Sequence, residues 1–468
     1  MTEDWGFYSH GEANIDYWSP RVAQVLAEQR IEKLRIRGWK QATVEGLIPF
    51  GDQIVRIFWE VYDDDDVPSL AALGQLHRLN ELSLRYGLDQ IDFSKLGMLD
   101  YLSVSADAPV FGNLNRSSSL RSLHITGCAL RNLTPLAGLD RLTELTIGEA
   151  PLKSLAGMNE LRGLRRLALA QVPLASLDGI EDLQAIEDIY IYMLGRLQSI
   201  APLTGLPSLR KLSIGAARKV ADFDQLGEMT ALEHLELLGS APQRLAVLSR
   251  LKRLKLLQLD NVGVLPSLAF LRGLDQLETF YPSQGTKIED GDLAVLLELP
   301  ALTRVLFTNR KHYTHTCGDI QHALTARSTR DVGAFDNAAS RIWLETLEQR
   351  NPVSWLGNTI GTALAFPPPK HVPALMAQYE IAAVELLALL AGRGAQGINY
   401  PETVTTWLAT NSVEPLGWLV ERAAKSLDRI VAPPSGLLEI WTDRGEVDRW
   451  RAALHDLKGR VLAINTSP

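Results

Sequence analysis

The residues best suited to chemistry gather in one short stretch, Asn309 to Asp319, which reads Asn-Arg-Lys-His-Tyr-Thr-His-Thr-Cys-Gly-Asp. Residues of the types that bind Zn²⁺ occur in it and just after it, namely His312, His315, Cys317 and His322. Zinc sites usually combine two closely spaced ligand pairs, and no second pair follows here, so we predict no metal site. Cys317 could instead act as a thiolate nucleophile if a cation such as Arg310, Lys311 or His315 lowered its pKa.

Four consecutive carboxylates, Asp63 to Asp66, are a second candidate for ion binding. Dedicated calcium loops alternate their ligands and contain a glycine, and this run does neither, so we predict a solvated loop. The chain also contains no G-x-S-x-G, no Walker-type phosphate loop and no H-E-x-x-H. The motifs therefore favour a noncatalytic protein that needs no cofactor.

A long internal repeat precedes this stretch and must position it. Eleven copies of the phrase L-x-x-L-x-x-L-x-L run from Leu76 to Phe307 in steps of 20 to 25 residues. Their L-x-L cores begin at Leu82, Leu102, Leu123, Leu145, Leu167, Ile189, Leu212, Leu235, Leu257, Phe280 and Val305. Two looser copies, Ile31–Ile36 and Ile54–Trp59, bring the total to about thirteen turns. A period this steady predicts a solenoid.

The spacing of apolar residues within one repeat predicts its local structure. Leu145 and Ile147 alternate with polar residues, which is the period of a strand with one buried face. From Leu152 to Leu161 an apolar residue recurs every third position, which suits a short 3₁₀ or extended return. One turn cannot bury these side chains alone, so the turns must stack. Thirteen strands spaced about 4.8 Å apart make a parallel sheet on the order of 60 Å along its arc.

On these repeats the chain resembles the leucine-rich repeat family, in particular the 22-residue, internalin-like class. In that family an Asn or Cys shortly after the strand bonds the backbone of the turn. Cys128 fills that position once, whereas other repeats carry Ala150, Val172, Ala217, Ser240 and Val262. The resemblance covers residues 31 to 310 and implies an α/β fold with a parallel sheet on the concave face. It leaves function open, because the family includes receptors, adaptors, inhibitors and enzyme-targeting arms.

The ends of the chain differ from the repeat. Residues 1–30, rich in Trp and Tyr, are predicted to form an N-terminal cap, since an open solenoid end exposes leucines and strand edges. We assign residues 31–317 to the solenoid and residues 318–468 to an all-α domain. Its helices are expected to begin near Ala338, Pro352, Pro373, Pro401, Pro415 and Glu446. The apolar stretch Ile381–Ala391, which carries Glu385, is expected to be its central buried helix.

Composition narrows the class of protein. The chain has 468 residues, of which 46% are apolar and 22% charged, as in soluble globular proteins of two domains. Two distant cysteines and the lack of a signal sequence or a long apolar run favour a cytoplasmic protein without membrane contact. A net charge of −8 argues against nucleic acid and for a basic protein partner. Ala, Leu and Arg usage suggests a bacterial source, and we expect a monomer.

A partner is expected to bind the residues between the buried leucines, because these face solvent on the concave sheet. They are Lys33, Arg35, Arg37, Arg56, Phe58, Arg85, Tyr101, His124, Arg166, Tyr190, Tyr192, His234, Tyr281 and Arg304. Tyrosine and arginine are enriched at binding hot spots, although cross-strand packing alone would also explain aromatics on a strand surface. The N-terminal arginines could converge on one acidic patch of a partner or pair internally with Glu60, Glu81 or the acidic run.

Two hypotheses from different classes follow. The first is a noncatalytic scaffold that binds a protein on the concave face, and a specific form of it is an immunity or inhibitor-type protein that masks a toxin. The alternative rests on Cys317-Gly-Asp319, which is similar to the C-x-D motif of bacterial effector E3 ubiquitin ligases that also join leucine-rich repeats to a helical domain. In those effectors the cysteine lies well inside the helical domain. Here the repeats would be the substrate-targeting arm.

Overall fold

The computed structural model describes residues 5–8, 12–15, 18–37, 41–59, 69–85, 90–105, 111, 114–239, 244–283, 285–328, 333–335, 337, 340, 343–344, 352–395, 398, 400–410 and 417–466. The chain divides into two compact units, which we describe separately. Unit 1 comprises Met1–Leu265, Ala269–Leu274 and Pro282–Lys287. Unit 2 comprises Pro266–Leu268, Asp275–Tyr281 and Ile288–Pro468.

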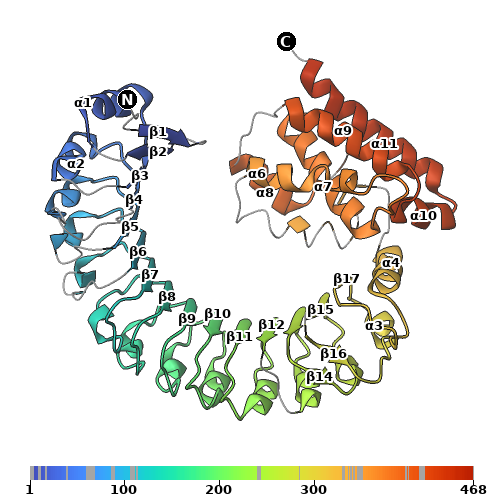
Figure 1. Ribbon diagram of the computed structural model, residues 1–468, viewed down its shortest axis with the longest axis horizontal. Helices are drawn as coiled ribbons and strands as arrows, with labels where there is room; N and C mark the ends of the chain where they lie inside the picture. The colour runs from blue at the N-terminus through green and yellow to red at the C-terminus, as the bar shows by residue number, and fades with distance from the viewer. Residues whose placement is uncertain are drawn as a thin grey trace. The chain divides into compact units, whose positions relative to one another are not determined.

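Strands follow one another in sequence order across a single sheet (Figure 1). They are β1 (Trp5–Tyr8), β2 (Glu12–Ile15), β3 (Lys33–Ile36), β4 (Arg56–Trp59), β5 (Glu81–Leu84), β6 (Tyr101–Ser105), β7 (Ser122–Thr126), β8 (Glu144–Gly148), β9 (Arg166–Ala170), β10 (Asp188–Tyr192), β11 (Lys211–Gly215), β12 (His234–Leu238), β13 (Leu256–Asp260), β15 (Thr279–Ser283) and β17 (Arg304–Val305). β1 pairs antiparallel with β2, which pairs parallel with β3. Every predicted L-x-L core begins on one of these strands, so the predicted solenoid is confirmed.

Return segments connect the strands of unit 1 on the outer side of their arc (Figure 1). They contain the 3₁₀ turns η2 (Ala71–Gln75), η4 (Phe93–Lys95), η5 (Leu114–Arg116), η6 (Thr134–Leu136), η7 (Met158–Glu160), η8 (Ile180–Asp182), η9 (Ala201–Gly205), η10 (Phe223–Glu228), η11 (Leu245–Arg250) and η12 (Ala269–Leu271). A second pairing, β14 (Val264–Leu265) with β16 (Lys287–Ile288), joins two returns. The three-residue apolar period thus indicated 3₁₀ returns correctly.

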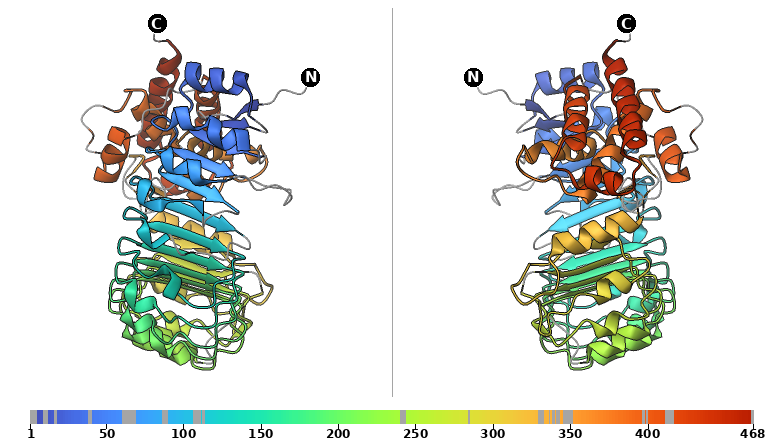
Figure 2. Two further views of the ribbon diagram at one scale, coloured as in Figure 1. Left: turned by 90° about the vertical axis from the view of Figure 1, so that its left-hand side faces the viewer. Right: turned by 90° about the vertical axis from the view of Figure 1, so that its right-hand side faces the viewer.

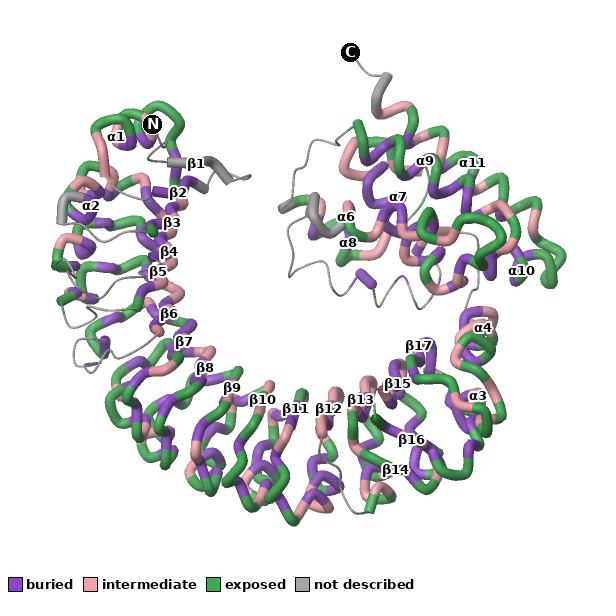
Figure 3. The backbone as a smooth tube through the Cα atoms, in the orientation of Figure 1, coloured by how far each residue is buried: buried purple, intermediate pink, exposed green. Residues whose placement is uncertain are grey.

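The core of unit 1 lies between the strands and the returns, and its buried residues recur in each rung (Figure 3). Along β9 the leucines Leu167 and Leu169 are buried while Arg166, Ala168 and Ala170 retain exposure. The same alternation holds along β3, β4, β5, β6 and β12. Figure 2 shows the strands as a ladder of near-parallel rungs. Each added rung therefore covers the leucines of the one before it.

The first helices of unit 1 pack beside its first rungs. They are α1 (Pro20–Gln29), α2 (Gln41–Gly46) and η1 (Ile48–Phe50). Ser19 caps α1 by accepting a hydrogen bond from the backbone N–H of Val22. The side chain of Gln53 donates to the carbonyls of Leu26 and Ile31, both at 2.8 Å, and so ties α1 to the first rung. The predicted limits of the cap stay a prediction.

Each strand from β7 to β13 is followed directly by a residue of left-handed conformation. These residues are Gly127, Glu149, Gln171, Met193, Ala216, Gly239 and Asn261, with φ between 51° and 71°. The N–H of each donates to the last carbonyl of the following strand, as Ala216 does to Leu238 at 2.7 Å. The polar ladder of the repeat family is largely missing at the next position, and this backbone bond links neighbouring turns instead.

Ala216 offers a direct test of that turn geometry. Alanine at a positive φ is strained, so we expect Ala216→Gly to raise the free energy of unfolding by about 0.5–1 kcal/mol. The matched change Ala168→Gly, within β9, is expected to lower it by a similar amount because glycine weakens a strand interior. Urea unfolding of both variants checks this. Destabilisation by both would contradict the proposed role of the left-handed turn.

Unit 2 is mostly helical. Its helices are α3 (Val295–Glu298), α4 (Cys317–Ser328), α6 (Pro352–Thr359), η14 (Thr362–Ala365), α7 (Ala374–Leu390), α8 (Glu402–Thr410), α9 (Gly417–Val431), α10 (Gly436–Asp443), α11 (Val447–Leu462) and η15 (Ala463–Thr466). The starts expected near Pro352, Pro373, Pro401 and Glu446 are found, whereas α4 and α10 were not predicted. Ala338 and Pro415 lie outside the described residues. No described helix is long and apolar enough to cross a membrane.

The last strand, β17, is covered by α4. The side-chain amide of Gln321 donates to the carbonyl of Thr303 at 2.7 Å and accepts from the N–H of Val305 at 3.0 Å. Arg327, at the end of α4, donates to the carbonyls of Leu299 and Leu302, both at 2.7 Å. These bonds satisfy backbone groups that a neighbouring rung would otherwise pair. The predicted boundary between residues 317 and 318 stays a prediction.

Helix α7 is buried along most of its length, as the stretch Ile381–Ala391 predicted. Two carboxylates nevertheless lie on it. Glu380 is fully buried and accepts bonds from the N–H groups of Gly361 and Ala363 and from the hydroxyls of Thr362 and Ser426. Its two oxygens thus accept from four donors. It joins α7 to the start of η14 and to α9.

Glu385 forms a second buried connection in unit 2. Its two carboxylate oxygens accept from Arg460 of α11, each at 2.8 Å, and one of them also accepts from the Tyr400 hydroxyl at 2.8 Å. Burial and the bond to Glu385 raise the pKa of Tyr400 to about 12. Tyr400 therefore stays protonated and can donate to the carboxylate at physiological pH.

Candidate functional site

The parallel register arranges the solvent-facing side chains of the strands in rows. One row runs Lys33, Arg56, Glu81, Tyr101, Ser122, Glu144, Arg166, Asp188, Lys211 and His234. The next runs Arg35, Phe58, Ser83, Ser103, His124, Thr146, Ala168, Tyr190, Ser213 and Glu236. Arg37 and Arg85 directly follow β3 and β5. All fourteen predicted binding residues are half-buried or exposed, and a binding role for them stays a prediction.

The N-terminal arginines are partly engaged within the chain. Arg56 forms an ion pair with Glu81, with 2.5 Å between Nε and Oε2, and donates a second bond of 2.8 Å. The Arg35 guanidinium lies 4.6 Å from the centre of the Phe58 ring. Internal pairing, one of the two alternatives for this cluster, therefore holds for Arg56. Glu60 and the run Asp63–Asp66 lie outside the described residues.

Charges in the middle of the sheet face alternate in sign from rung to rung. Arg166 forms an ion pair with Glu144, and Asp188 lies between Arg166 and Lys211 in the register. Burial raises the pKa of Asp188, and the two flanking cations oppose that shift. Exposed pairs of this kind contribute at most about 1 kcal/mol each to stability. Their main effect is to leave this part of the face close to neutral.

Aromatic and apolar side chains gather on the part of the face in unit 1 at Tyr190, Tyr192 and Met193, which we call the tyrosine patch. The two tyrosine rings stack with their centroids 6.1 Å apart at an angle of 21°. Tyr190 is 38% exposed and Met193, which follows β10, is 45% exposed. Exposed rings beside a methionine form the kind of surface that protein interfaces use.

Small residues on the two neighbouring strands leave the tyrosine rings without large side chains beside them. Ala168 and Ala170 lie opposite the tyrosines on β9, and Ser213 and Gly215 lie opposite them on β11. A Cβ at Gly215 would lie 2.5 Å from Cδ2 of Tyr192, so the ring can occupy its position only beside glycine. Met193 and Gly215 were not predicted from the sequence. Gly215 occupies the same position in its repeat as Tyr192 does in the preceding one. A small residue at such a position is the sequence signal that could have predicted it.

The pKa shifts of Tyr190, His234 and His124 on this face all favour their neutral forms at physiological pH. Burial, and then the neighbouring Tyr192 and Glu236, raise the pKa of Tyr190. Burial lowers the pKa of His234 and of His124, which lies 5.1 Å from the Tyr101 ring. The face therefore presents protonated hydroxyls, neutral imidazoles and aromatic rings. Such groups suit recognition by contact and hydrogen bonding.

Two predicted residues, Tyr281 and Arg304, lie in unit 2 beside α7. The Arg304 guanidinium is 5.5 Å from the centre of the Tyr281 ring and 5.6 Å from that of Tyr379. Burial raises the pKa of Tyr379 to about 12. Tyr379 was not predicted, because nothing in the sequence places α7 beside the last rung.

Cys317, the candidate nucleophile, is the first residue of α4. Burial raises the pKa of its thiol, the opposite of what a nucleophile needs. Asp319 accepts from the N–H of Thr316 at 2.9 Å, and the Thr316 hydroxyl accepts from the N–H of Asp319 at 3.1 Å. The C-x-D motif is thus explained by a reciprocal cap at the start of the helix, and no geometric feature supports the ligase alternative.

The neighbouring histidines have local partners. His312 Nε2 lies 2.9 Å from the carbonyl of Ile288, and His315 Nδ1 lies 2.9 Å from the Thr314 hydroxyl. Among the described residues, no three His, Cys, Asp or Glu side chains come close enough together to hold a metal ion.

Cys317 should therefore react slowly with thiol reagents. Since its pKa is raised, less thiolate exists at pH 7 than for an unperturbed cysteine, and alkylation should accelerate only as the pH rises toward that raised pKa. We expect iodoacetamide at pH 7 to modify Cys317 at least about tenfold more slowly in the folded chain than in urea. Mass spectrometry of the peptide containing Cys317 measures this. Faster alkylation in the folded chain would contradict the geometry.

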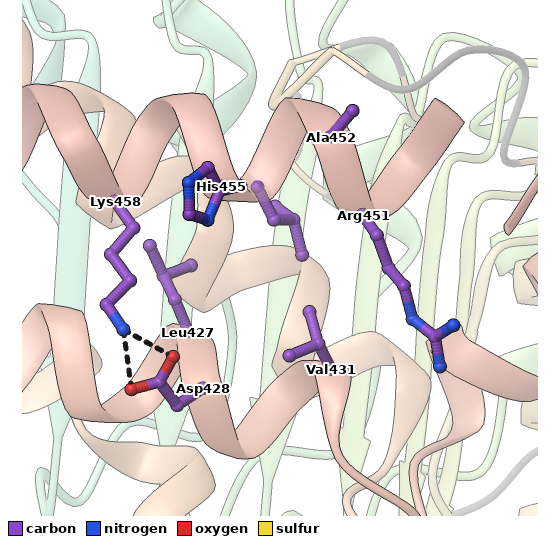
Figure 4. Close-up of a pocket in the computed structure, with 8 residues that line it drawn as sticks. Leu427, Asp428, Val431, Arg451, Ala452, His455 and Lys458 are labelled. Atoms are coloured by element: carbon purple, nitrogen blue, oxygen red, sulfur yellow. Dashed lines mark hydrogen bonds and ion pairs between the residues drawn. The ribbon is translucent and has the colours of Figure 1, made fainter. Parts of the chain in front are cut away.

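Unit 2 also contains a groove of about 380 Å³ between α9 and α11 (Figure 4). Leu427, Val431 and Leu454 contribute apolar side chains to its lining, and Arg451, His455 and Lys458 line it from α11. Lys458 donates to both oxygens of Asp428 across the groove, at 2.6 and 2.7 Å. This pair neutralises one end, so the groove is mainly an apolar depression.

In comparison with known proteins, the C-terminal part of the chain matches one family. Residues 328–453 match a family described as a domain of unknown function (DUF4259). No curated protein matches the sequence.

Solved structures of repeat proteins resemble the chain at low identity. An internalin, InlF, from Listeria monocytogenes is 18% identical, with a TM-score of 0.48, over 64% of this chain and 88% of its own. A leucine-rich repeat protein from Leptospira interrogans is 19% identical, with a TM-score of 0.48, over 66% of this chain and 79% of its own. The solenoid is assigned from the parallel strands and the recurring buried leucines of this chain, and the solved structures are not needed for it.

Proposed function

Because this chain is a leucine-rich repeat protein, we propose that it is a noncatalytic scaffold that binds a protein partner on the solvent-facing side of its parallel sheet. The observation that carries the proposal is the tyrosine patch. Tyr190 and Tyr192 stack on each other in the middle of the face, with only small residues beside them on β9 and β11. Large rings with free surroundings can enter depressions of a partner and act as anchors.

The chemistry of the face supports a protein partner over a small molecule. The rows of side chains extend over many rungs, and Arg56 and Arg166 are each paired with a glutamate of a neighbouring strand. A surface of this size can contact the 20 to 30 residues per partner, on the order of 800 Å², of a typical protein interface. Because the rungs hold the face in one shape, little conformational entropy is lost on binding.

A narrower form of the proposal is an inhibitor or immunity-type protein of the bacterial cytoplasm. The face is preformed, its middle rungs carry charges of alternating sign, and the tyrosine patch lies among them. A surface of this kind suits the masking of another protein's active site. The net charge of −8 favours a partner of net positive charge.

Site-specific photo-crosslinking in cells of the source organism tests where the partner binds. Benzoylphenylalanine replaces Ala168, on the face beside Tyr190, or Asn159, in the return segment η7. Both positions retain exposure, so both variants should fold. We expect a light-dependent protein adduct from position 168 and none from position 159. Adducts from position 159 alone, or from neither, would refute binding on the sheet face.

A further inference from the structure

Arg304 differs from three other arginines that are buried or half-buried in unit 2. Arg460 is paired with Glu385, Arg327 donates to carbonyls of the last return, and Arg429 donates to four backbone carbonyls. Arg304 has no ion pair with any acidic residue that the structure describes. A half-buried guanidinium without an anionic partner is uncommon, because removing such a charge from water is costly.

The Arg304 guanidinium makes a hydrogen bond with the side chain of Tyr281, but two other groups here have no partner. Its own Nε and the hydroxyl of Tyr379 are both buried, and neither makes a hydrogen bond. The rings of Tyr281 and Tyr379 hold the guanidinium in place, which limits the entropy it would lose on binding an anion. Planar guanidinium groups held in this way are suited to binding carboxylates.

Exposed apolar side chains lie next to this cluster. Leu306 is two residues beyond Arg304, on the same face of the strand, and is 59% exposed. Met376 precedes Tyr379 by three residues on α7, which places it on the same side of the helix, and it is 42% exposed. A cationic centre with apolar neighbours is complementary to an acidic residue that has an apolar residue beside it.

We propose that Arg304 binds a carboxylate of the protein partner, an aspartate or glutamate with a neighbouring apolar side chain that contacts Leu306 and Met376. This inference rests on the proposed function, since it names one contact chemistry of the same partner. A partner of net positive charge can contribute such a local acidic residue. In the competing explanation, Arg304 only packs α7 against the last rung and binds no ligand.

Nuclear magnetic resonance of the full-length protein, labelled with ¹⁵N-arginine, tests the proposal without knowledge of the partner. The probe is N-acetyl-Leu-Glu amide, and its neutral counterpart N-acetyl-Leu-Gln amide is the control. The Nε–H signal of Arg304 is assigned as the one lost in Arg304→Lys. So small a ligand should bind with a dissociation constant in the millimolar range, so titration to about 20 mM suffices.

We expect the Glu probe to shift the Arg304 signal to saturation, because a carboxylate bound at the terminal N–H₂ groups alters the electronic environment of the whole guanidinium. The Gln probe should cause at most about a tenth of that shift at equal concentration. The signal of Arg460, which is already paired with Glu385, should stay in place. An Arg304 signal that does not move, or that moves no more than that of the exposed Arg451, would overturn the proposal.

The outcome is separable from that of the proposed function. A shift at Arg304 with no crosslink from position 168 would support the carboxylate site and refute binding on the sheet face. A crosslink from position 168 with no shift at Arg304 would support the scaffold and leave Arg304 as a packing residue. A change in the unfolding midpoint of Arg304→Lys alone supports only packing, which is why the probe titration decides the question.

Discussion

Replacing Glu380 by glutamine is expected to lower the free energy of unfolding of the helical part of unit 2 by about 3 kcal/mol or more. Each oxygen of Glu380 now accepts two of the four bonds from Gly361, Thr362, Ala363 and Ser426. The glutamine side chain would keep one acceptor oxygen and place an amide N–H₂ where the second oxygen accepts from two donors. The backbone N–H of those two donors would lose its acceptor, which costs about 1–3 kcal/mol. The hydroxyl would have to turn to accept from the amide, and the two remaining bonds would weaken because their acceptor is no longer a carboxylate.

Hydrogen exchange of the full-length protein, followed by mass spectrometry of peptides from α7, measures this loss locally. The control is Glu439→Gln, in which the same chemical change affects an exposed carboxylate that pairs with His371 at 3.1 Å. It should alter stability by less than about 1 kcal/mol. Equal exchange rates in the two variants would show that the four bonds to Glu380 do not stabilise the helical part.

Replacing both Tyr190 and Tyr192 by Ala is expected to weaken partner binding about a thousandfold. Anchors of this kind each contribute at least about 2 kcal/mol, and two such losses correspond to that factor. Stability should change little, because both rings stand on the solvent-facing side of β10 and the core contacts of Ile189 and Ile191 remain.

Titration calorimetry with the crosslinked partner, once purified, measures the loss. A useful companion is Gly215→Ala, whose added methyl group must displace the Tyr192 ring without removing it. It should weaken binding by roughly tenfold or more, whereas Thr146→Ala, two rungs away on the same face, should have little effect. Unchanged affinity of the double tyrosine variant would move the binding surface elsewhere.

The rungs of this protein could be predicted from the sequence because each copy of the repeat supports the assignment of the others. The alternation of Leu145 and Ile147 predicts a strand, and ten similar phrases at nearly equal steps leave little room for another register. Which side chains face solvent follows from the same alternation. The exposed or half-buried positions of Tyr190, Arg166 and His124 were therefore accessible without coordinates.

Details of the site depend on contacts between residues far apart in sequence, which periodicity does not encode. The Tyr192 ring needs Gly215, which lies 23 residues later on the next strand. Likewise Arg304 owes its position between two rings to Tyr379, on a helix 75 residues further along the chain. No local pattern predicts either contact.

The sequence by itself determined a stack of leucine-rich rungs with an exposed strand face, because each rung repeats the same short-range pattern of burial. Tertiary structure decided which groups on that face are already paired and which remain available. Arg56 is paired with Glu81, and Asp319 caps a helix instead of assisting Cys317. The physical reason is that pairing and burial depend on distances of a few ångströms between side chains, and the packing of complete elements sets those distances.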